Sequence, residues 1–174
     1  MTKVPFIYTE CKENSNGFDI NFISKEVHGD STGVDITGIA KVVRGNSRGV
    51  DITVVMKFVD GDSKGVDITG IEKVVSGNSK GVSLTGLFNY SGGVEDFLIQ
   101  YGTLVNYIKE KDDDSFGLQI GLYNRIGDQT RPLINFWGLK NILGYFQIKA
   151  AEKRLEKLKE KKRAPKKEFS ILGN

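Results

Sequence analysis

The sequence predicts a mainly β protein, an antiparallel β-meander curled into a half-barrel or barrel, built from 16-residue repeats and followed by a basic C-terminal α-helix. Three observations predict this class. Glycines recur at a fixed step of 16 residues, at Gly17, Gly33, Gly49, Gly65 and Gly81. Residues typical of turns cluster between the copies, and β-branched residues alternate with polar ones inside each copy. We therefore expect each copy to form one structural unit.

Alternation assigns two faces to each predicted strand, as the copy GVDITGIAKVV (33–43) illustrates. The apolar side comprises Val34, Ile36, Gly38, Ala40 and Val42. The other side is half polar and comprises Asp35, Thr37, Ile39, Lys41 and Val43. We expect the first side to be buried and the second to be mixed.

The repeat is compatible with two architectures, a parallel β-solenoid and an antiparallel meander. In a solenoid, equivalent side chains would stack about 4.8 Å apart, with Asp35 on Asp51 and Lys41 on Lys57. Like charges directly opposite each other are destabilising. A meander with three-residue loops instead places Asp35 opposite Lys57, and Lys41 opposite Asp51. Charge pairing therefore predicts the meander.

The turns favour the same conclusion. A solenoid coil needs at least two corners, whereas each repeat has one reliable turn cluster, such as RGNSR (44–48). The second corner would fall at Gly38 and Gly70, but the middle copy has Val54 at that position. A one-residue bulge at the Thr37–Gly38 step would move Asp and Lys to opposite faces, so this step decides between the architectures.

Beyond the repeats, the sequence predicts more strands. Residues 93–111 also fit a helix, because Phe97, Tyr101 and Leu104 fall on one helical stripe, but the echo between QYGTLVN and QIGLYN favours a strand. The acidic run KEKDDDS (109–115) predicts a solvated hairpin loop. FGLQIGLYNRI (116–126) and PLINFWGL (132–139) predict strands, which brings the total to about eight.

The C-terminal part differs in composition. Residues 149–168 hold ten Lys or Arg and four Glu, a net charge of +6, which leaves −3 for residues 1–148 given the total of +3. The segment is rich in helix formers with a narrow apolar seam, and Pro165 ends it. We divide the chain into a repetitive antiparallel β domain (1–141), a basic amphipathic helix (142–164) and a flexible tail (165–174).

Composition excludes several classes of protein. Cys11 is the single cysteine, so the chain forms no internal disulfide. The N-terminal residues lack the apolar run of a signal peptide, and no stretch approaches the roughly 18 apolar residues of a membrane-spanning helix. We expect a cytoplasmic protein, with a membrane-associated or cell-surface location as the alternative.

The stretch FGLQIGLYNRIGDQTRPLINFWG (116–138) resembles the surface-repeat proteins of bacteria and archaea, which contain tandem units like Gly-Leu-Gln-Ile-Gly-Leu-Tyr-Asn. The segment from Arg131 to Phe136 is similar to the Leu-Pro-Leu-Ile-Asn-Phe-like ending of many members. The 16-residue copies match loosely, because Thr37 and its equivalents add one residue. The resemblance implies a repetitive β protein. The family is mostly uncharacterised, so the resemblance implies no reaction.

The candidate sites in the repeats each have a simpler structural explanation. His28 lacks a Ser-His-Asp or Cys-His context, and Cys11 lies in a polar loop. Asp30 and Asp35 suggest calcium, but the spacing of a calcium loop is missing, so we expect a hairpin turn. Glu72 lies on the apolar face, where we expect a position near the sheet rim. We therefore expect no catalytic residue, no metal and no cofactor.

These patterns predict a non-enzymatic β-repeat scaffold or interaction module that binds a protein partner or a second copy of itself through open sheet edges. One alternative is a membrane-associated β-barrel or surface protein. The other is binding of an anionic membrane surface or a nucleic acid by the basic helix. The candidate anion-binding residues are Lys153, Arg154, Lys157, Lys161, Lys162 and Arg163.

Overall fold

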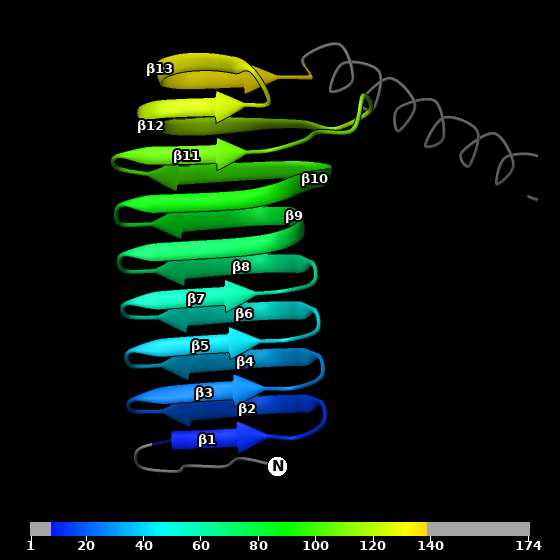
Figure 1. Ribbon diagram of the computed structural model, residues 1–174, viewed down its shortest axis with the longest axis vertical. Helices are drawn as coiled ribbons and strands as arrows, with labels where there is room; N and C mark the ends of the chain where they lie inside the picture. The colour runs from blue at the N-terminus through cyan, green and yellow to red at the C-terminus, as the bar shows by residue number, and fades with distance from the viewer. Residues whose placement is uncertain (1–7, 139–174) are drawn as a thin grey trace, which may run out of the picture. The chain divides into compact units, whose positions relative to one another are not determined.

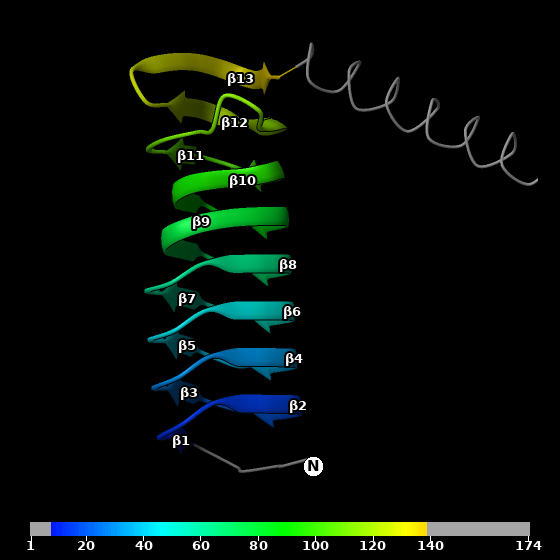
Figure 2. The same cartoon turned by 90° about the vertical axis from the view of Figure 1, so that its right-hand side faces the viewer.

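The computed structural model describes residues 8–138, and these residues fold as a β-solenoid in which successive coils stack on one another (Figures 1 and 2). The thirteen described strands belong to one continuous hydrogen-bonded sheet. They are β1 (Tyr8–Cys11), β2 (Ser15–Asn21), β3 (Ser24–Val27), β4 (Ser31–Thr37), β5 (Ala40–Val43), β6 (Ser47–Thr53), β7 (Met56–Val59), β8 (Ser63–Thr69), β9 (Glu72–Thr85), β10 (Phe88–Gly102), β11 (Val105–Ile108), β12 (Phe116–Ile126) and β13 (Gln129–Trp137).

Each 16-residue repeat makes one coil with two walls. The long wall consists of β2, β4, β6 and β8, followed by the second halves of β9 and β10 and the first half of β12. The short wall consists of β1, β3, β5 and β7, followed by the first halves of β9 and β10, by β11 and by the second half of β12. Every pairing within these walls is parallel, so equivalent residues of successive copies lie side by side.

The predicted antiparallel meander, half-barrel or barrel is therefore wrong. Asp35 pairs in register with Asp51, and Lys41 pairs in register with Lys57, which is the solenoid arrangement that the sequence argument rejected. The second corner also exists without glycine. In the middle copy the bend contains Val54, whose backbone N–H donates to the carbonyl oxygen of Thr37 at 3.0 Å. This bend needs no left-handed residue, because the described non-glycine residues with positive φ are Asp96 and Leu133.

The predicted inner and outer faces are also reversed. Asp35, Thr37 and Lys41 are buried between the walls, whereas Val34 and Ile36 point outward and are half-buried. The apolar part of the repeat interior is one column of valines, made of Val27, Val43, Val59 and Val75. The remaining buried positions of each coil hold serine, aspartate, threonine or asparagine, and lysine.

The C-terminal coils end in a cap. Strand β13 turns back and pairs antiparallel with the whole length of β12, which covers the last coil (Figure 1). Beneath the cap the interior becomes apolar, with Val94, Leu98, Ile108, Ile126 and Trp137 in one cluster. The predicted strands in residues 93–111 and at 116–126 are confirmed. Residues 109–115 form a loop as predicted, but this loop joins two parallel coils and is not a hairpin turn. The predicted helix (142–164) and tail (165–174) lie outside the described residues.

Glycines that recur at the start of each long strand allow the coils to stack closely. Gly33, Gly49 and Gly65 have φ angles between 124° and 131°, a region that side chains disfavour. A Cβ atom at Gly49 would lie 2.0 Å from the carbonyl oxygen of Gly33 in the coil before it. The glycine step that reveals the repeat in the sequence is therefore required by backbone conformation and by stacking.

We predict that Gly49→Ala lowers the free energy of unfolding by about 2 kcal/mol or more, because alanine adds both backbone strain and a clash with the neighbouring coil. Urea denaturation followed by circular dichroism measures the change. Arg48→Ala, at the exposed neighbouring position, serves as the control and should change stability by less than about 0.5 kcal/mol. Equal effects of the two substitutions would contradict the stacking role of Gly49.

Candidate functional site: an ionic interior and an apolar edge

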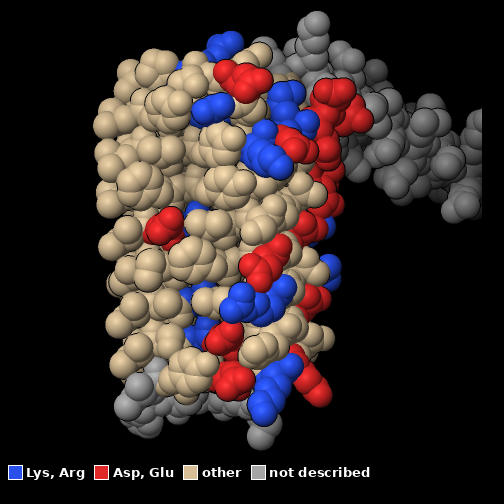
Figure 3. All heavy atoms as spheres, viewed as in Figure 1, with Lys and Arg blue, Asp and Glu red and all other residues tan. Residues whose placement is uncertain are grey.

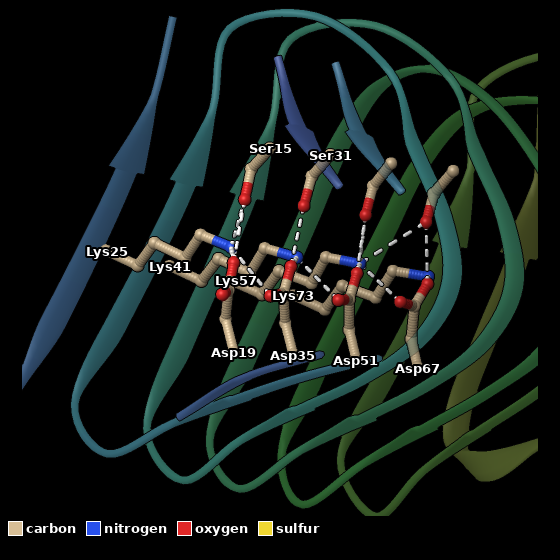
Figure 4. A network of polar contacts seen from close by, with 12 residues as sticks. Ser15, Asp19, Lys25, Ser31, Asp35, Lys41, Asp51, Lys57, Asp67 and Lys73 are labelled. Atoms are coloured by element: carbon tan, nitrogen blue, oxygen red, sulfur yellow. Dashed lines mark hydrogen bonds and ion pairs between the residues drawn. The ribbon is translucent and has the colours of Figure 1, made fainter. Parts of the chain in front are cut away.

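A ladder of alternating charges runs through the interior of the first coils (Figure 4). The lysines come from the short wall and are Lys25, Lys41, Lys57 and Lys73. The aspartates come from the long wall and are Asp19, Asp35, Asp51 and Asp67. All of these side chains are buried, which is rare for lysine and aspartate unless they are paired. We call these eight residues the ionic ladder.

Each lysine of the ionic ladder except the last bridges two aspartates of neighbouring coils. The Nζ atom of Lys25 lies 2.6 Å from Asp19 Oδ2 and 2.6 Å from Asp35 Oδ1. Lys41 contacts Asp35 and lies 2.5 Å from Asp51 Oδ1, and Lys57 contacts Asp51 and Asp67. Lys73 then lies 2.5 Å from Asp67 Oδ2. The result is one continuous chain of ion pairs along the solenoid.

This geometry explains why the solenoid tolerates stacked residues of like charge. Lysines do stack on lysines along one wall, but their ammonium groups extend across the interior to the opposite wall. The Nζ of Lys41 lies between the carboxylates of Asp35 and Asp51, so its nearest charges are of opposite sign. The penalty for opposed like charges assumes that the facing residues have no closer partner of opposite charge. Of the two pairs that the meander predicted, Lys41–Asp51 does form an ion pair.

A column of buried serines holds the carboxylates in place. The hydroxyl of Ser31 donates to Asp35 Oδ2 at 2.6 Å, and the hydroxyl of Ser63 donates to Asp67 Oδ2 at 2.7 Å. Because each serine lies four residues before its aspartate on the same long strand, one strand supplies both groups. Buried carboxylates need several donors, and the serines add to those of the lysines.

Neutral side chains replace the charges towards the C-terminal coils. Ser83 stands where the ladder would have aspartate and Asn89 where it would have lysine, and the Nζ of Lys73 donates to Ser83 Oγ at 3.0 Å. Beyond this point amides continue the ladder. Gln119 Nε2 donates to Gln100 Oε1 at 3.0 Å, and Asn135 Nδ2 of the cap donates to Gln119 Oε1 at 3.1 Å.

Burial and pairing act in opposite directions on the ladder pKa values. Burial alone would raise the pKa of Asp67, but the charges of Lys57 and Lys73 outweigh it and hold that pKa well below its usual range. The pKa of Asp51 is lowered in the same way by Lys57 and Lys41. Burial lowers the pKa of Lys73 and of Lys41, and the like charge of Lys57 adds to the effect at both. At Lys57 itself, the charges of Asp67 and Asp51 outweigh burial and raise the pKa. The carboxylates of Asp51 and Asp67 are therefore held ionised at neutral pH.

The residues that the sequence singled out in turns have structural roles. Asp30 Oδ1 accepts hydrogen bonds from Asn46, and Asn46 Oδ1 accepts one from the Asp62 backbone N–H at 2.9 Å, so this column joins successive turns. No group of three or more potential metal ligands occurs within residues 8–138. His28 is exposed and lies 3.2 Å from Glu10, and Cys11 packs against the valine column.

The outer surface carries a second continuous feature, which we call the apolar edge. It follows the bends that lead from the long wall to the short wall, and its bend residues are Phe22, Ile23, Ile39, Val54, Val55, Ile71, Leu87, Leu104 and Leu122. Ile39, Val54 and Leu122 expose 47%, 61% and 58% of their surface. The nearest outward column of the long wall is Ile20, Ile36, Ile52, Ile68, Leu84, Tyr101 and Ile120, and that of the short wall is Ser24, Ala40, Met56, Glu72, Phe88, Val105 and Tyr123.

Charged residues gather on the opposite side, at the turns that lead from the short wall back to the long wall (Figure 3). Surface ion pairs connect them there, as between Arg44 and both Glu26 and Asp60. Glu72 is the one charged side chain in the columns of the apolar edge, and it is half-buried. The alternation in the sequence predicted this apolar face correctly, but the prediction that it is buried in the core is wrong. Its exposure could have been inferred only by recognising that Asp35 and Lys41 neutralise each other inside the coil.

These features define a parallel β-solenoid repeat protein with an ionic interior and an apolar edge. The chain matches no protein-family model, no curated protein and no solved structure. The resemblance to surface-repeat proteins stays a prediction. Across the described residues, the structure has no helix with the length and apolarity needed to cross a membrane.

We predict that Lys57→Met lowers the free energy of unfolding by about 3 kcal/mol or more, because it leaves the buried carboxylates of Asp51 and Asp67 without a shared cation. Thr53→Val, in the same coil, is the matched control. The Thr53 hydroxyl is buried without a hydrogen-bond partner, so its removal should be neutral or stabilising by about 1 kcal/mol. Urea denaturation compares the variants. Similar losses in both would show that the ion pairs do not stabilise the coil.

The lowered carboxylate pKa values also predict acid lability. A group whose pKa is depressed in the folded state stabilises the fold fully above its unfolded pKa, which is 3.8 for Asp67, and the contribution is lost as pH falls towards the folded pKa. We expect the free energy of unfolding to change little between neutral pH and about pH 5 and to fall below about pH 4. In Lys57→Met the fall should be smaller, because the pKa values of Asp51 and Asp67 are less depressed without the charge of Lys57. Coincident profiles for the two proteins would contradict this assignment.

Proposed function

We propose that this protein is a non-enzymatic β-repeat scaffold whose apolar edge is its interaction surface. One observation carries the proposal, namely that the repeat buries the lysine and aspartate of the ionic ladder and places a continuous column of apolar side chains outside, over seven successive bends. Soluble monomers rarely expose contiguous apolar patches larger than a few hundred square ångströms unless the patch has a binding role.

The size of the apolar edge fits an interface. Six intervals of about 4.8 Å between the seven bends give a height of roughly 29 Å. With the next outward column of each wall included, the strip extends in one coil from Val34 to Val42, a contour of about 26 Å at roughly 3.3 Å per residue. Glu26 and Arg125 are the charged residues in these two added columns. The product, roughly 750 Å², is close to the ~800 Å² that one partner contributes to a standard protein interface.

The buried charges support a structural role for the interior. Catalysis needs acids and bases that can reach a substrate, whereas Lys41 and Asp51 are buried and hydrogen-bonded to each other. The other members of the ionic ladder are committed in the same way. The ladder supports the coil, and the repetition of the coil extends the apolar edge, which is the division of roles expected of a scaffold.

The predicted binding of anions through Lys153, Arg154, Lys157, Lys161, Lys162 and Arg163 concerns residues outside the described part of the chain. Binding of a nucleic acid by these residues therefore stays a prediction. A protein partner and self-association both stay compatible with the apolar edge as the interaction surface.

Light scattering after size exclusion, in buffer and in a non-ionic detergent, tests the proposal. We expect the wild-type chain to self-associate in buffer and to become a monomer with bound detergent, because a second copy and a detergent micelle each remove the apolar edge from water. The variant carrying Ile39→Asn and Ile71→Asn should lose most of both effects. A wild-type chain that is monomeric in buffer and binds no detergent would contradict the apolar edge as an interaction surface.

A further inference from the structure

The apolar edge is a convex ridge, which restricts what can cover it. Its apolar columns lie on both sides of the bends, with Ile36 on the long wall and Ala40 on the short wall flanking Ile39. A second solenoid could press one wall against another, but it would leave the far side of each ridge in water. A fluid apolar medium covers both sides of a ridge at once.

The backbone of the ridge is suited to an apolar medium. The bend residues donate backbone hydrogen bonds to the coil before them, as from Gly38 to Asn21 at 2.8 Å and from Val54 to Thr37 at 3.0 Å. Leu87 donates to Ile71 at 3.1 Å in the same way. Backbone donors that already have partners remove the main obstacle to placing non-helical chain in the acyl region of a bilayer.

The same chain supplies charge for the lipid headgroups. Residues 149–168 carry a net charge of +6, and polybasic segments are attracted to anionic phospholipids by about 1 kcal/mol for each basic residue near the surface. Stable membrane attachment usually takes two signals, for example an apolar one and a polybasic one. Both signals occur here, in separate parts of the sequence.

We infer that the apolar edge inserts into the interfacial region of an anionic phospholipid bilayer, with the basic C-terminal segment strengthening the attachment. This inference rests on the proposed function, since it names the partner of that interaction surface. Insertion to the boundary between headgroups and acyl chains, as amphipathic helices achieve, would immerse the bend residues and leave the charged turns on the opposite side in water. Glu72 is the one charged side chain of the edge columns and opposes insertion.

Co-sedimentation of the full chain with lipid vesicles tests the inference. We expect binding to vesicles of phosphatidylcholine with phosphatidylserine, and weaker binding to vesicles of phosphatidylcholine alone. Ile39→Asn with Ile71→Asn should weaken binding to the mixed vesicles by roughly tenfold or more, because two exposed isoleucines no longer contribute apolar burial. Thr32→Asn with Ser76→Asn is the matched control, since it adds the same residues at exposed positions away from the apolar edge.

Two further variants separate the contributions. Lys153→Gln, Arg154→Gln and Lys157→Gln together should remove most of the preference for phosphatidylserine, by roughly tenfold or more in affinity for the mixed vesicles. Glu72→Gln should strengthen binding to both kinds of vesicle, because it removes a charge from the inserted surface. Circular dichroism of each variant verifies that the fold is kept.

Each remaining outcome overturns the inference. A chain that binds detergent and self-associates through the apolar edge, but does not bind vesicles, has a second copy as its partner, and the proposed function stands without the membrane. Vesicle binding that is unaffected by Ile39→Asn with Ile71→Asn shows that the ridge does not insert. A chain that is monomeric in buffer and binds neither detergent nor vesicles overturns the inference and the proposed function together.

Discussion

The structure depends on a single arrangement, in which a buried lysine is shared between the aspartates of two successive coils. Lys57 contacts both Asp51 and Asp67, so each coil is linked to the next by charge as well as by backbone hydrogen bonds. A slip of one residue between coils would turn these side chains to the outside and leave their partners buried alone. Unpaired buried charge is among the most costly defects in a protein, so the ladder strongly disfavours other registers.

The ionic interior also determines the outer surface. A two-walled coil has few inward positions, and here lysine, aspartate, serine and threonine occupy most of them. The aliphatic residues of the repeat, such as Ile36 and Ile52, then have no core to enter and lie outside. Stability in the first coils must come largely from the parallel backbone pairing, the ionic ladder and the valine column, with apolar packing concentrated beneath the cap.

Much of the local structure could be predicted from the sequence, and the error arose at one step. The repeat length and the turn at residues 44–48 followed from glycine spacing and from the turn residues, and the strand within 93–111 followed from the echo between QYGTLVN and QIGLYN. The strand direction did not follow. The rule that like charges opposite each other are destabilising was considered only between neighbouring strands of one wall, and the charges on the facing wall were left out. Lys41 is long enough to reach Asp51 on the other wall, and that reach is not visible in a one-dimensional pattern. The assumption that the apolar face is the core then reversed the faces. The expectation that the second corner needs glycine added to the error, because the structure has a bend at Val54.

The charges of the ladder balance within each repeat, and this has a consequence for the length of the solenoid. Because one coil adds one lysine and one aspartate, the interior stays neutral for any number of coils, and duplication of the unit leaves no charge unpaired. Ending the ladder requires both charges to disappear in the same coil, as they do where Ser83 and Asn89 replace them. Replacing the aspartate alone would leave the lysine of that coil with an incomplete set of acceptors, and replacing the lysine alone would bury an excess of negative charge. Each added coil also lengthens the apolar edge by one bend. Because the interior stays neutral at any number of coils, the number of repeats can determine the length of the apolar edge.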